Sequence, residues 1–195
     1  MKVIIIAAGY GSRLGIQTKE LPKALVDING KSILERQSEL LQAFGVKEII
    51  VVTGPNKDKF TNQNLLYIED RLYHEHEQLG SLMEAHAHFD DELLVLFSDV
   101  LFDQKVLSKV IDSQCDIGIA VDLDWKKGYE GRTQHPIEQA DLALVENNSV
   151  INIQKNLDSS NNSTGEFIGI LKLSQLGAKR FLDHFSNLKS FHQGK

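Results

Sequence analysis

The 195-residue sequence is poor in the features that would crosslink it or anchor it in a membrane. Its one cysteine, Cys115, can form no internal disulfide, and no Cys/His spacing typical of a zinc site surrounds it. No apolar run approaches the roughly 18 residues that a membrane span requires, and the run at residues 3–8 is too short for a signal peptide. These absences predict a soluble, cytoplasmic protein that forms its core without disulfides.

Positive charge is also scarce. The chain has 21 Lys and Arg residues against 27 Asp and Glu residues, a net charge of −6, which argues against a general nucleic-acid-binding surface. Residues 1–31 differ, because they hold five basic and two acidic side chains and so carry a local charge of +3, leaving −9 for the remaining residues. A basic N-terminal segment on an acidic chain suits a small anionic ligand.

What the sequence does contain is a regular alternation of strand and helix patterns. Apolar runs at residues 3–8 and 48–53 are typical of buried strands, and between them the capping-box pair Ser32 and Glu35 begins a helix that ends at Gly45. This order predicts a parallel βαβ crossover. Similar patterns predict strands at residues 65–69, 93–97, 116–121 and 167–173, helices at 103–113, at 174–188 and from near Ser81, and a hairpin around Asn147 and Asn148.

Together these elements predict one α/β domain over residues 1–195, with a mixed, mostly parallel sheet flanked by helices. Residues 122–141 have no clean period and hold the single tryptophan among charged residues and glycines. We interpret this stretch as an insertion that acts as a lid or binds substrate.

The segment AAGYGSRLG, residues 7–15, directly follows the first buried strand. Its glycines would let backbone N–H groups approach phosphates, and Arg13 adds a planar, charged fork. A tight turn with a surface arginine is the alternative. The segment is not a P-loop, since Gly-Lys-Ser at residues 30–32 lacks the preceding glycine frame. Its third glycine comes one position late for a dinucleotide fingerprint, which disfavours a nicotinamide enzyme.

Two residues outside this loop extend the predicted phosphate site. Lys23 lies with Lys19 on either side of Pro22, and two lysines and an arginine near a glycine loop favour a polyphosphate ligand. Asp99 follows the strand at 93–97, at the edge where open α/β sheets bind ligands. A carboxylate there is suited to hold Mg²⁺ on the polyphosphate, although a helix-capping aspartate is the alternative.

Histidines offer a less favoured metal site. The run HEHE at residues 74–77 could bind zinc, but its i, i+2 spacing in a polar stretch favours a solvated loop. His86 and His88 cannot share one helix face. His135, close to Arg132, could contact a substrate or be a simple surface histidine.

Four motifs in order, AAGYGSRL, LPKALVDINGK, FSDVLF and GEFIGILKLS, resemble the nucleotidyltransferase family of sugar-phosphate pyrophosphorylases and their cytidylyltransferase relatives. The resemblance covers nearly the whole chain and implies a Rossmann-like, GT-A-type fold. It implies that the first motif and the following lysine wrap a triphosphate, through Ala7, Ala8, Gly9, Gly11, Ser12, Arg13 and Lys23.

The other motifs imply further roles. Base recognition falls on Gln78, Gly80 and Ser81, and Asp99 becomes the magnesium ligand. Lys155 stands where many members carry a phosphate-contacting lysine, although the usual Glu-Lys is here Gln-Lys. With an acceptor that is already anionic, no general base is needed, and Arg13, Lys23, Lys155 and Mg²⁺ would position the reactants and offset charge.

The insertion is similar to the segment of phosphocholine-type and phosphonate cytidylyltransferases. The resemblance implies CMP transfer from CTP to an aminoalkyl phosphonate or phosphocholine-type acceptor, with release of pyrophosphate. Arg132 would bind the anionic head of the acceptor. The ammonium tail would be bound by a carboxylate and by aromatic faces, from Asp122 or Asp124 and from Trp125 and Tyr129. Packing is the alternative for the two aromatic rings.

Two other functions stay open. They are a UTP- or dTTP-dependent sugar-1-phosphate nucleotidylyltransferase and a non-catalytic nucleotide-binding module. Members of the group usually continue past the last helix with a segment that supplies a second magnesium-binding aspartate and often a dimer contact, and we expect that segment to be missing here. The metal site would then be completed otherwise, and a homodimer stays an open expectation.

Overall fold

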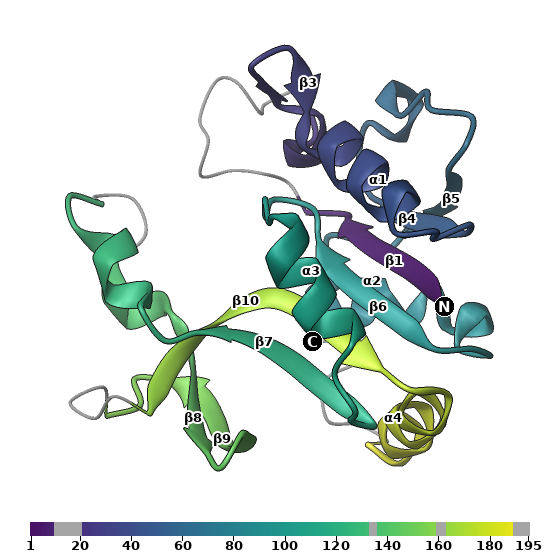
Figure 1. The fold of residues 1–195 in the computed structure, drawn as a ribbon. Helices are drawn as coiled ribbons and strands as arrows, with labels where there is room; N and C mark the ends of the chain where they lie inside the picture. The colour runs from purple at the N-terminus through teal and green to yellow at the C-terminus, as the bar shows by residue number, and fades with distance from the viewer. Residues whose placement is uncertain (10–20, 133–135, 159–162, 189–195) are drawn as a thin grey trace. The chain divides into compact units, whose positions relative to one another are not determined.

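The computed structural model describes residues 1–9, 21–132, 136–158 and 163–188 (Figure 1). The chain divides into two compact units, one formed by Met1–Gly118 with Leu171–Lys195 and the other by Ile119–Ile170. Within the described ranges, no helix has both the length and the apolar character that crossing a bilayer demands.

The first unit is built on parallel strands. β1 (Lys2–Ala7) lies between β4 (Ile49–Thr53) and β6 (Leu93–Phe97), and β4 pairs in parallel with β5 (Leu66–Glu69). Every residue of β4 is buried, as its continuous apolar run predicts for a strand covered on both faces. The predicted parallel crossover is therefore confirmed.

Helices pack on these strands. They are α1 (Ile33–Ala43), α2 (Gln78–Met83), α3 (Gln104–Ile111) and α4 (Gln175–Asn187). Leu82 of α2 and Ala178 of α4 join Ile4 and Ile50 of the central strands in one buried cluster. A small two-stranded ribbon, β2 (Asp27–Ile28) and β3 (Lys31–Ser32), precedes α1, and short 3-10 turns occur at Lys23–Leu25, Lys57–Lys59 and His86–His88.

Side-chain caps confirm three predicted helix starts. The Ser32 hydroxyl accepts from the Glu35 N–H, and the Glu35 carboxylate accepts from the Ser32 N–H, so the capping box forms as expected. Asp103 and Ser174 cap α3 and α4 in the same way, each accepting a backbone N–H three residues on.

The second predicted capping box is wrong. α2 begins at Gln78, and its N-cap residue Glu77 makes no side-chain cap. Ser81, the expected cap, lies inside the helix, where its hydroxyl donates to Asp70 at 2.8 Å. The Ser-x-x-Glu spacing of a capping box is present, but the Ser81 hydroxyl donates to the buried Asp70 carboxylate and does not cap the helix.

The second unit is antiparallel. β8 (Asp141–Glu146) pairs with β9 (Ser149–Lys155) and with the start of β10 (Thr164–Leu173), which is longer than predicted and whose last three residues belong to the first unit. Asn147 and Asn148, at φ 48° and 61°, adopt the left-handed conformations of a type I′ turn, which confirms the predicted hairpin.

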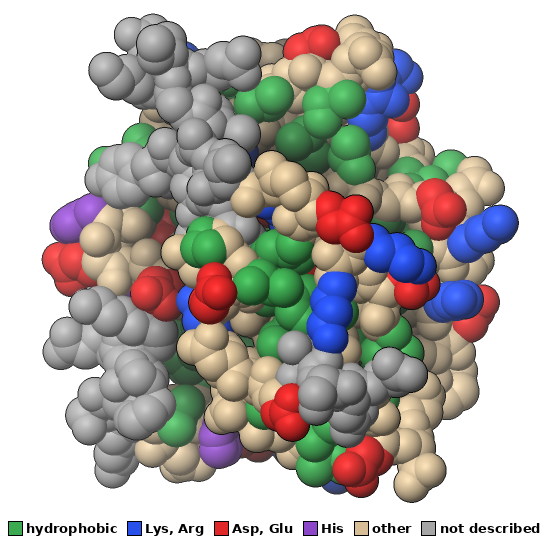
Figure 2. Space-filling view, turned by 90° about the vertical axis from the view of Figure 1, so that its left-hand side faces the viewer, with side chains coloured by type: hydrophobic (Ala, Val, Ile, Leu, Met, Phe, Trp, Pro, Cys, Tyr) green, Lys and Arg blue, Asp and Glu red, His purple; other side chains and the backbone are tan. Residues whose placement is uncertain are grey.

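The remaining elements complete a mixed sheet flanked by helices, as expected for the fold class. β7 (Ile117–Asp122) pairs with β10, and 3-10 turns at Trp125–Tyr129 and Ile137–Gln139 lie within residues 122–141. The extent and role of the insertion stay predictions. Figure 2 shows described side chains of both charge signs at the surface.

Candidate functional site

Lys23 and Asp99 form an ion pair in the first unit. Lys23 Nζ lies 3.1 Å from Asp99 Oδ2, although the two residues are 76 positions apart. Asp99 comes two residues after β6, at the carboxyl ends of the parallel strands, where open α/β sheets bind ligands. Both side chains keep access to solvent, at 24% and 44% exposure. An ammonium group and a carboxylate side by side suit a phosphate and its counter-cation.

The chemistry of Asp99 fits Mg²⁺. This ion is usually held by one or two carboxylates and completes its shell with water and substrate phosphate oxygens. Asp99 supplies one such carboxylate, and Lys23 beside it can contact the same phosphates. Asp99 could therefore hold the ion on a bound polyphosphate without a closed set of protein ligands.

The predicted phosphate loop is described only at its start. Ala7 ends β1, Ala8 is 2% exposed, and a Cβ on Gly9 would meet no described atom within 4 Å. Gly11, Ser12 and Arg13 lie outside the described residues. Gly54, which no sequence pattern singled out, allows the chain after β4 to approach the start of the loop closely, because a Cβ there would clash with the Ala8 carbonyl oxygen.

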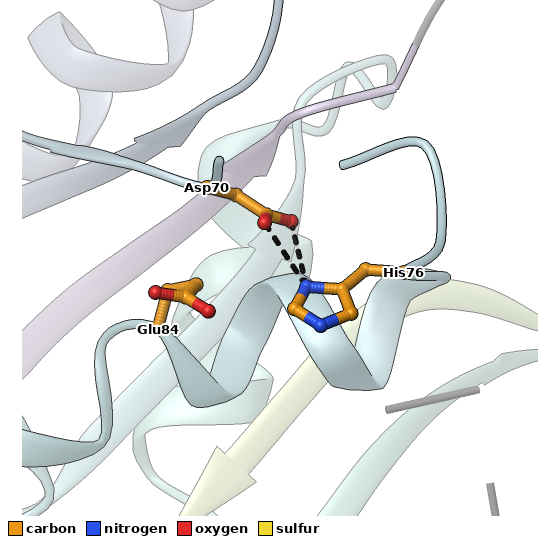
Figure 3. Close-up of side chains that lie close together, drawn as sticks. All are labelled: Asp70, His76 and Glu84. Atoms are coloured by element: carbon orange, nitrogen blue, oxygen red, sulfur yellow. Dashed lines mark hydrogen bonds and ion pairs between the residues drawn. The ribbon is translucent and has the colours of Figure 1, made fainter. Parts of the chain in front are cut away.

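A buried carboxylate organises the predicted base-recognition segment (Figure 3). Asp70, directly after β5, is 0% exposed. It accepts from the Leu72 N–H at 2.9 Å, from Ser81 Oγ at 2.8 Å, and pairs with His76 Nδ1 at 3.0 Å. Because His76 precedes α2 and Ser81 lies within it, Asp70 holds the segment in which Gln78 is exposed and Gly80 and Ser81 are buried.

The solvated-loop interpretation of the HEHE run is therefore wrong for His76, whose side chain is only 10% exposed, and it holds for His74, at 53%. The missed signal was Asp70, an acidic residue directly after the predicted strand at 65–69.

Among the described residues, Asp70, His76 and Glu84 also form one group of three side chains of the types that can bind a metal ion. Their potential ligand atoms lie within 4.8 Å of one another. However, both oxygens of Asp70 already accept hydrogen bonds, and Glu84 is exposed at the end of α2. The geometry supports a structural role for this cluster. The proposed magnesium site stays at Asp99.

In the second unit, the two candidate aromatic residues are buried. Trp125 and Tyr129, at 3% and 9% exposure, pack edge-to-face against each other and contact Ala140 and Leu142. Trp125 Nε1 donates to the Thr164 carbonyl at 3.2 Å. This geometry favours the packing alternative, and acceptor binding by these rings stays a prediction.

The Tyr129 hydroxyl donates to the Glu166 carboxylate. Burial, and then this hydrogen bond, raise the pKa of the phenol far above its ordinary value of 10. The guanidinium of Arg132 lies over the Tyr129 ring, 4.5 Å from its centroid, so an arginine already occupies one π face that was predicted for an ammonium group.

The charged candidates of this unit are exposed. Asp122 Oδ1 accepts from the Asp124 N–H at 2.8 Å, and Asp124 pairs with Lys127 at 3.1 Å. Arg132 is exposed as well. Lys155 ends β9, opposite Asp141 in the hairpin register, and is also exposed. Each of these side chains can reach a ligand from solvent, and their roles stay predictions.

Comparison with known proteins places the chain in a family. The model of the MobA-like NTP transferase domain matches residues 3–144. The CTP:phosphoglutamine cytidylyltransferase of Campylobacter jejuni is 28% identical over 185 residues, which span 89% of this chain and 73% of that protein. The UTP--glucose-1-phosphate uridylyltransferase AglF of Haloferax volcanii is 26% identical over 140 residues, 64% of this chain and 56% of that protein.

A solved structure agrees on the fold. The CTP:phosphocholine cytidylyltransferase of Streptococcus pneumoniae aligns with a TM-score of 0.70 over 96% of this chain and 77% of that chain, at 20% identity. The family model spans well over half of the chain, so the resemblance drawn from the four motifs is confirmed. The chain belongs to the MobA-like NTP transferase domain family.

Proposed function

We propose that this protein is a Mg²⁺-dependent cytidylyltransferase that transfers CMP from CTP to an aminoalkyl phosphonate or phosphocholine-type acceptor and releases pyrophosphate. The observation that carries the proposal is the Lys23–Asp99 pair at the carboxyl end of β6, in a chain of the NTP transferase family. Similarity to a cytidylyltransferase over 89% of the chain favours CTP as the donor. We place the reaction in the cytoplasm, with a homodimer as an assembly to be tested.

The mechanism needs positioning more than proton transfer. The phosphate or phosphonate oxygen of the acceptor is an anion near neutral pH, so it can attack the α-phosphorus of CTP in line without a general base. Mg²⁺ on Asp99 would supply charge neutralisation on the phosphates. Lys23, once it turns from Asp99 to the triphosphate, would offset the charge that develops on the leaving pyrophosphate.

The other candidate residues have narrower proposed roles. Arg13 and the glycines of the first loop would bind the triphosphate, and Lys155 would contact a phosphate. In the second unit, we propose that the exposed Arg132 binds the anionic head of the acceptor and that Asp122 or Asp124 faces its ammonium group. Trp125 and Tyr129 would shape that site from within the core.

A sugar-1-phosphate nucleotidylyltransferase is the second candidate, because similarity to a uridylyltransferase extends over 64% of the chain. A pyrophosphate-release assay with each of the four NTPs separates the two. We expect turnover with CTP and phosphocholine or 2-aminoethylphosphonate. Turnover with UTP or dTTP and glucose-1-phosphate instead would contradict the proposal.

The Asp99→Ala variant separates catalysis from a non-catalytic nucleotide-binding module. We expect it to lose turnover and to keep metal-free CTP binding. The matched control is Asp58→Ala, which removes an exposed carboxylate from a 3-10 turn and should leave turnover unchanged. A wild-type protein that binds CTP and never releases pyrophosphate with any acceptor would support the module.

A further inference from the structure

Gln37 connects helix α1 to the turn that carries Asp99. It lies in the middle of α1 and is 2% exposed. Its Nε2 donates to the carbonyl oxygen of Phe97 at 3.0 Å and to that of Val100 at 2.7 Å. Only the NH₂ side of the amide can donate to two carbonyls, so the chemistry fixes the orientation of the side chain.

The two carbonyls lie on either side of Asp99. Phe97 is the last residue of β6, and Ser98 and Asp99 separate it from Val100. Ser98 is buried, and its N–H donates to the Ile6 carbonyl of β1 at 3.2 Å. The turn is thus held from the strand side by β1 and from the helix side by one amide, and Asp99 is its exposed residue.

Helix α1 is a firm support for this contact. Its start is fixed by the Ser32–Glu35 capping box, and Ile33, Leu34 and Leu41 are buried along its length. A donor on this helix therefore holds the turn in one place relative to the core. Gln37 Oε1, in contrast, is buried and has no hydrogen-bond partner within the described part of the chain. A buried acceptor without a partner lowers the net stability that the side chain contributes, whereas the two bonds to the turn are directional.

We propose that Gln37 is a positioning residue for the metal-binding carboxylate of Asp99, an inference that rests on the magnesium role in the proposed function. A single exposed carboxylate holds a cation well only when its backbone is fixed, because ligand positions must be kept to within roughly 0.5 Å. Residues that orient a metal ligand without touching the metal change metal affinity by about 10–100-fold when they are removed. Gln37 occupies such a place through the backbone on both sides of Asp99.

The test compares CTP binding with and without metal. The variant Gln37→Met keeps the length of the side chain and removes both donors. The affinity for Mn²⁺–CTP is measured by water-proton relaxation, and the affinity for metal-free CTP by calorimetry in EDTA. We expect Gln37→Met to weaken Mn²⁺–CTP binding about tenfold, at the lower end of the outer-shell range, and to leave metal-free CTP binding within twofold of the wild type.

Two further comparisons make the result specific. Gln42→Met is the same substitution at an exposed position of the same helix, and it should change neither affinity. In an Asp99→Ala background, Gln37→Met should cause no additional loss, because the two residues act through one site. If Gln37→Met fails to fold, Gln37→His keeps one ring N–H donor and should give a loss smaller than tenfold.

The inference is overturned if Gln37→Met weakens both forms of CTP equally, if it weakens neither, or if its effect persists in full without Asp99. It is also overturned if the wild type binds Mn²⁺–CTP no better than metal-free CTP. None of these measurements needs an acceptor. Failure to release pyrophosphate would therefore contradict the proposed function and leave the metal-binding inference standing.

Discussion

The two units hold their candidate functional side chains in different ways. In the first unit, buried polar groups such as Asp70 and Gln37 bond the backbone or neighbouring side chains and leave Asp99 and Lys23 accessible. In the second unit, the aromatic candidates are themselves the core, as the burial of Trp125 shows. Buried polar side chains hold separate backbone segments in the first unit. In the second unit the candidate rings form the core, and the exposed candidates are charged side chains.

Asp70→Ala should have the largest effect and tests the network of the first unit. It leaves the donors of Leu72, His76 and Ser81 without their buried acceptor. We expect a loss of about 3–5 kcal/mol in the free energy of unfolding, measured by urea denaturation. Asp58→Ala, at an exposed position, should stay within about 0.5 kcal/mol of the wild type. A loss below about 1 kcal/mol for Asp70→Ala would remove the contrast between the two units.

Lys23→Met is expected to be second and tests the accessible site. It removes the ammonium group beside Asp99 and keeps most of the aliphatic stem. We expect kcat/KM for CTP to fall about 100-fold, as for the loss of one charge-stabilising donor in a transition state. Lys47→Met, at an exposed position after α1, is the matched control and should retain full activity. Equal activity of the two variants would contradict the assigned role of Lys23.

The elements that could be predicted from the sequence are those specified by local patterns of residues. The strand β1, the capped helix α1 and the strand β4 follow from continuous apolar runs and a four-residue capping pattern. The position of Asp99 follows from a general rule about the ends of parallel strands, whereas its pairing with Lys23 across 76 positions does not.

The features that could not be predicted from the sequence depend on contacts between residues that lie far apart in the chain. Ser81 has the spacing of a helix cap, but Asp70, 11 residues earlier, takes its hydroxyl. The bond from Gln37 to Phe97 spans 60 residues and leaves no pattern in the sequence. The burial of Trp125 and Tyr129 likewise depends on their packing against Ala140 and Leu142. Only the fold brings these residues into contact.

Arg132→Met sharpens the comparison inside the second unit. Because Arg132 is exposed and can bind an anionic head, we expect its loss to raise the KM for the acceptor about tenfold and to change the KM for CTP little. Trp125→Phe, which alters a buried ring, should lower the melting temperature and leave the acceptor KM within about twofold. The reverse outcome would show that the tryptophan contacts the acceptor and would make the two units alike.

Tyr129→Phe should have the smallest effect on the free energy of unfolding. The effect should show mainly as a change in how stability depends on pH. The variant loses the hydrogen bond to Glu166, which we expect to cost about 1 kcal/mol near pH 8. The pKa of Tyr129 is raised in the folded protein, first by burial, so its contribution to stability is fully present below the ordinary pKa of about 10 and is lost as pH rises above that value. In urea titrations from pH 8 to 11, the stability of the wild type should therefore fall toward that of Tyr129→Phe. Parallel curves across this range would mean that the Tyr129 hydroxyl is in contact with solvent, which would place the ring at the surface and break the contrast between an exposed polar site and an aromatic core.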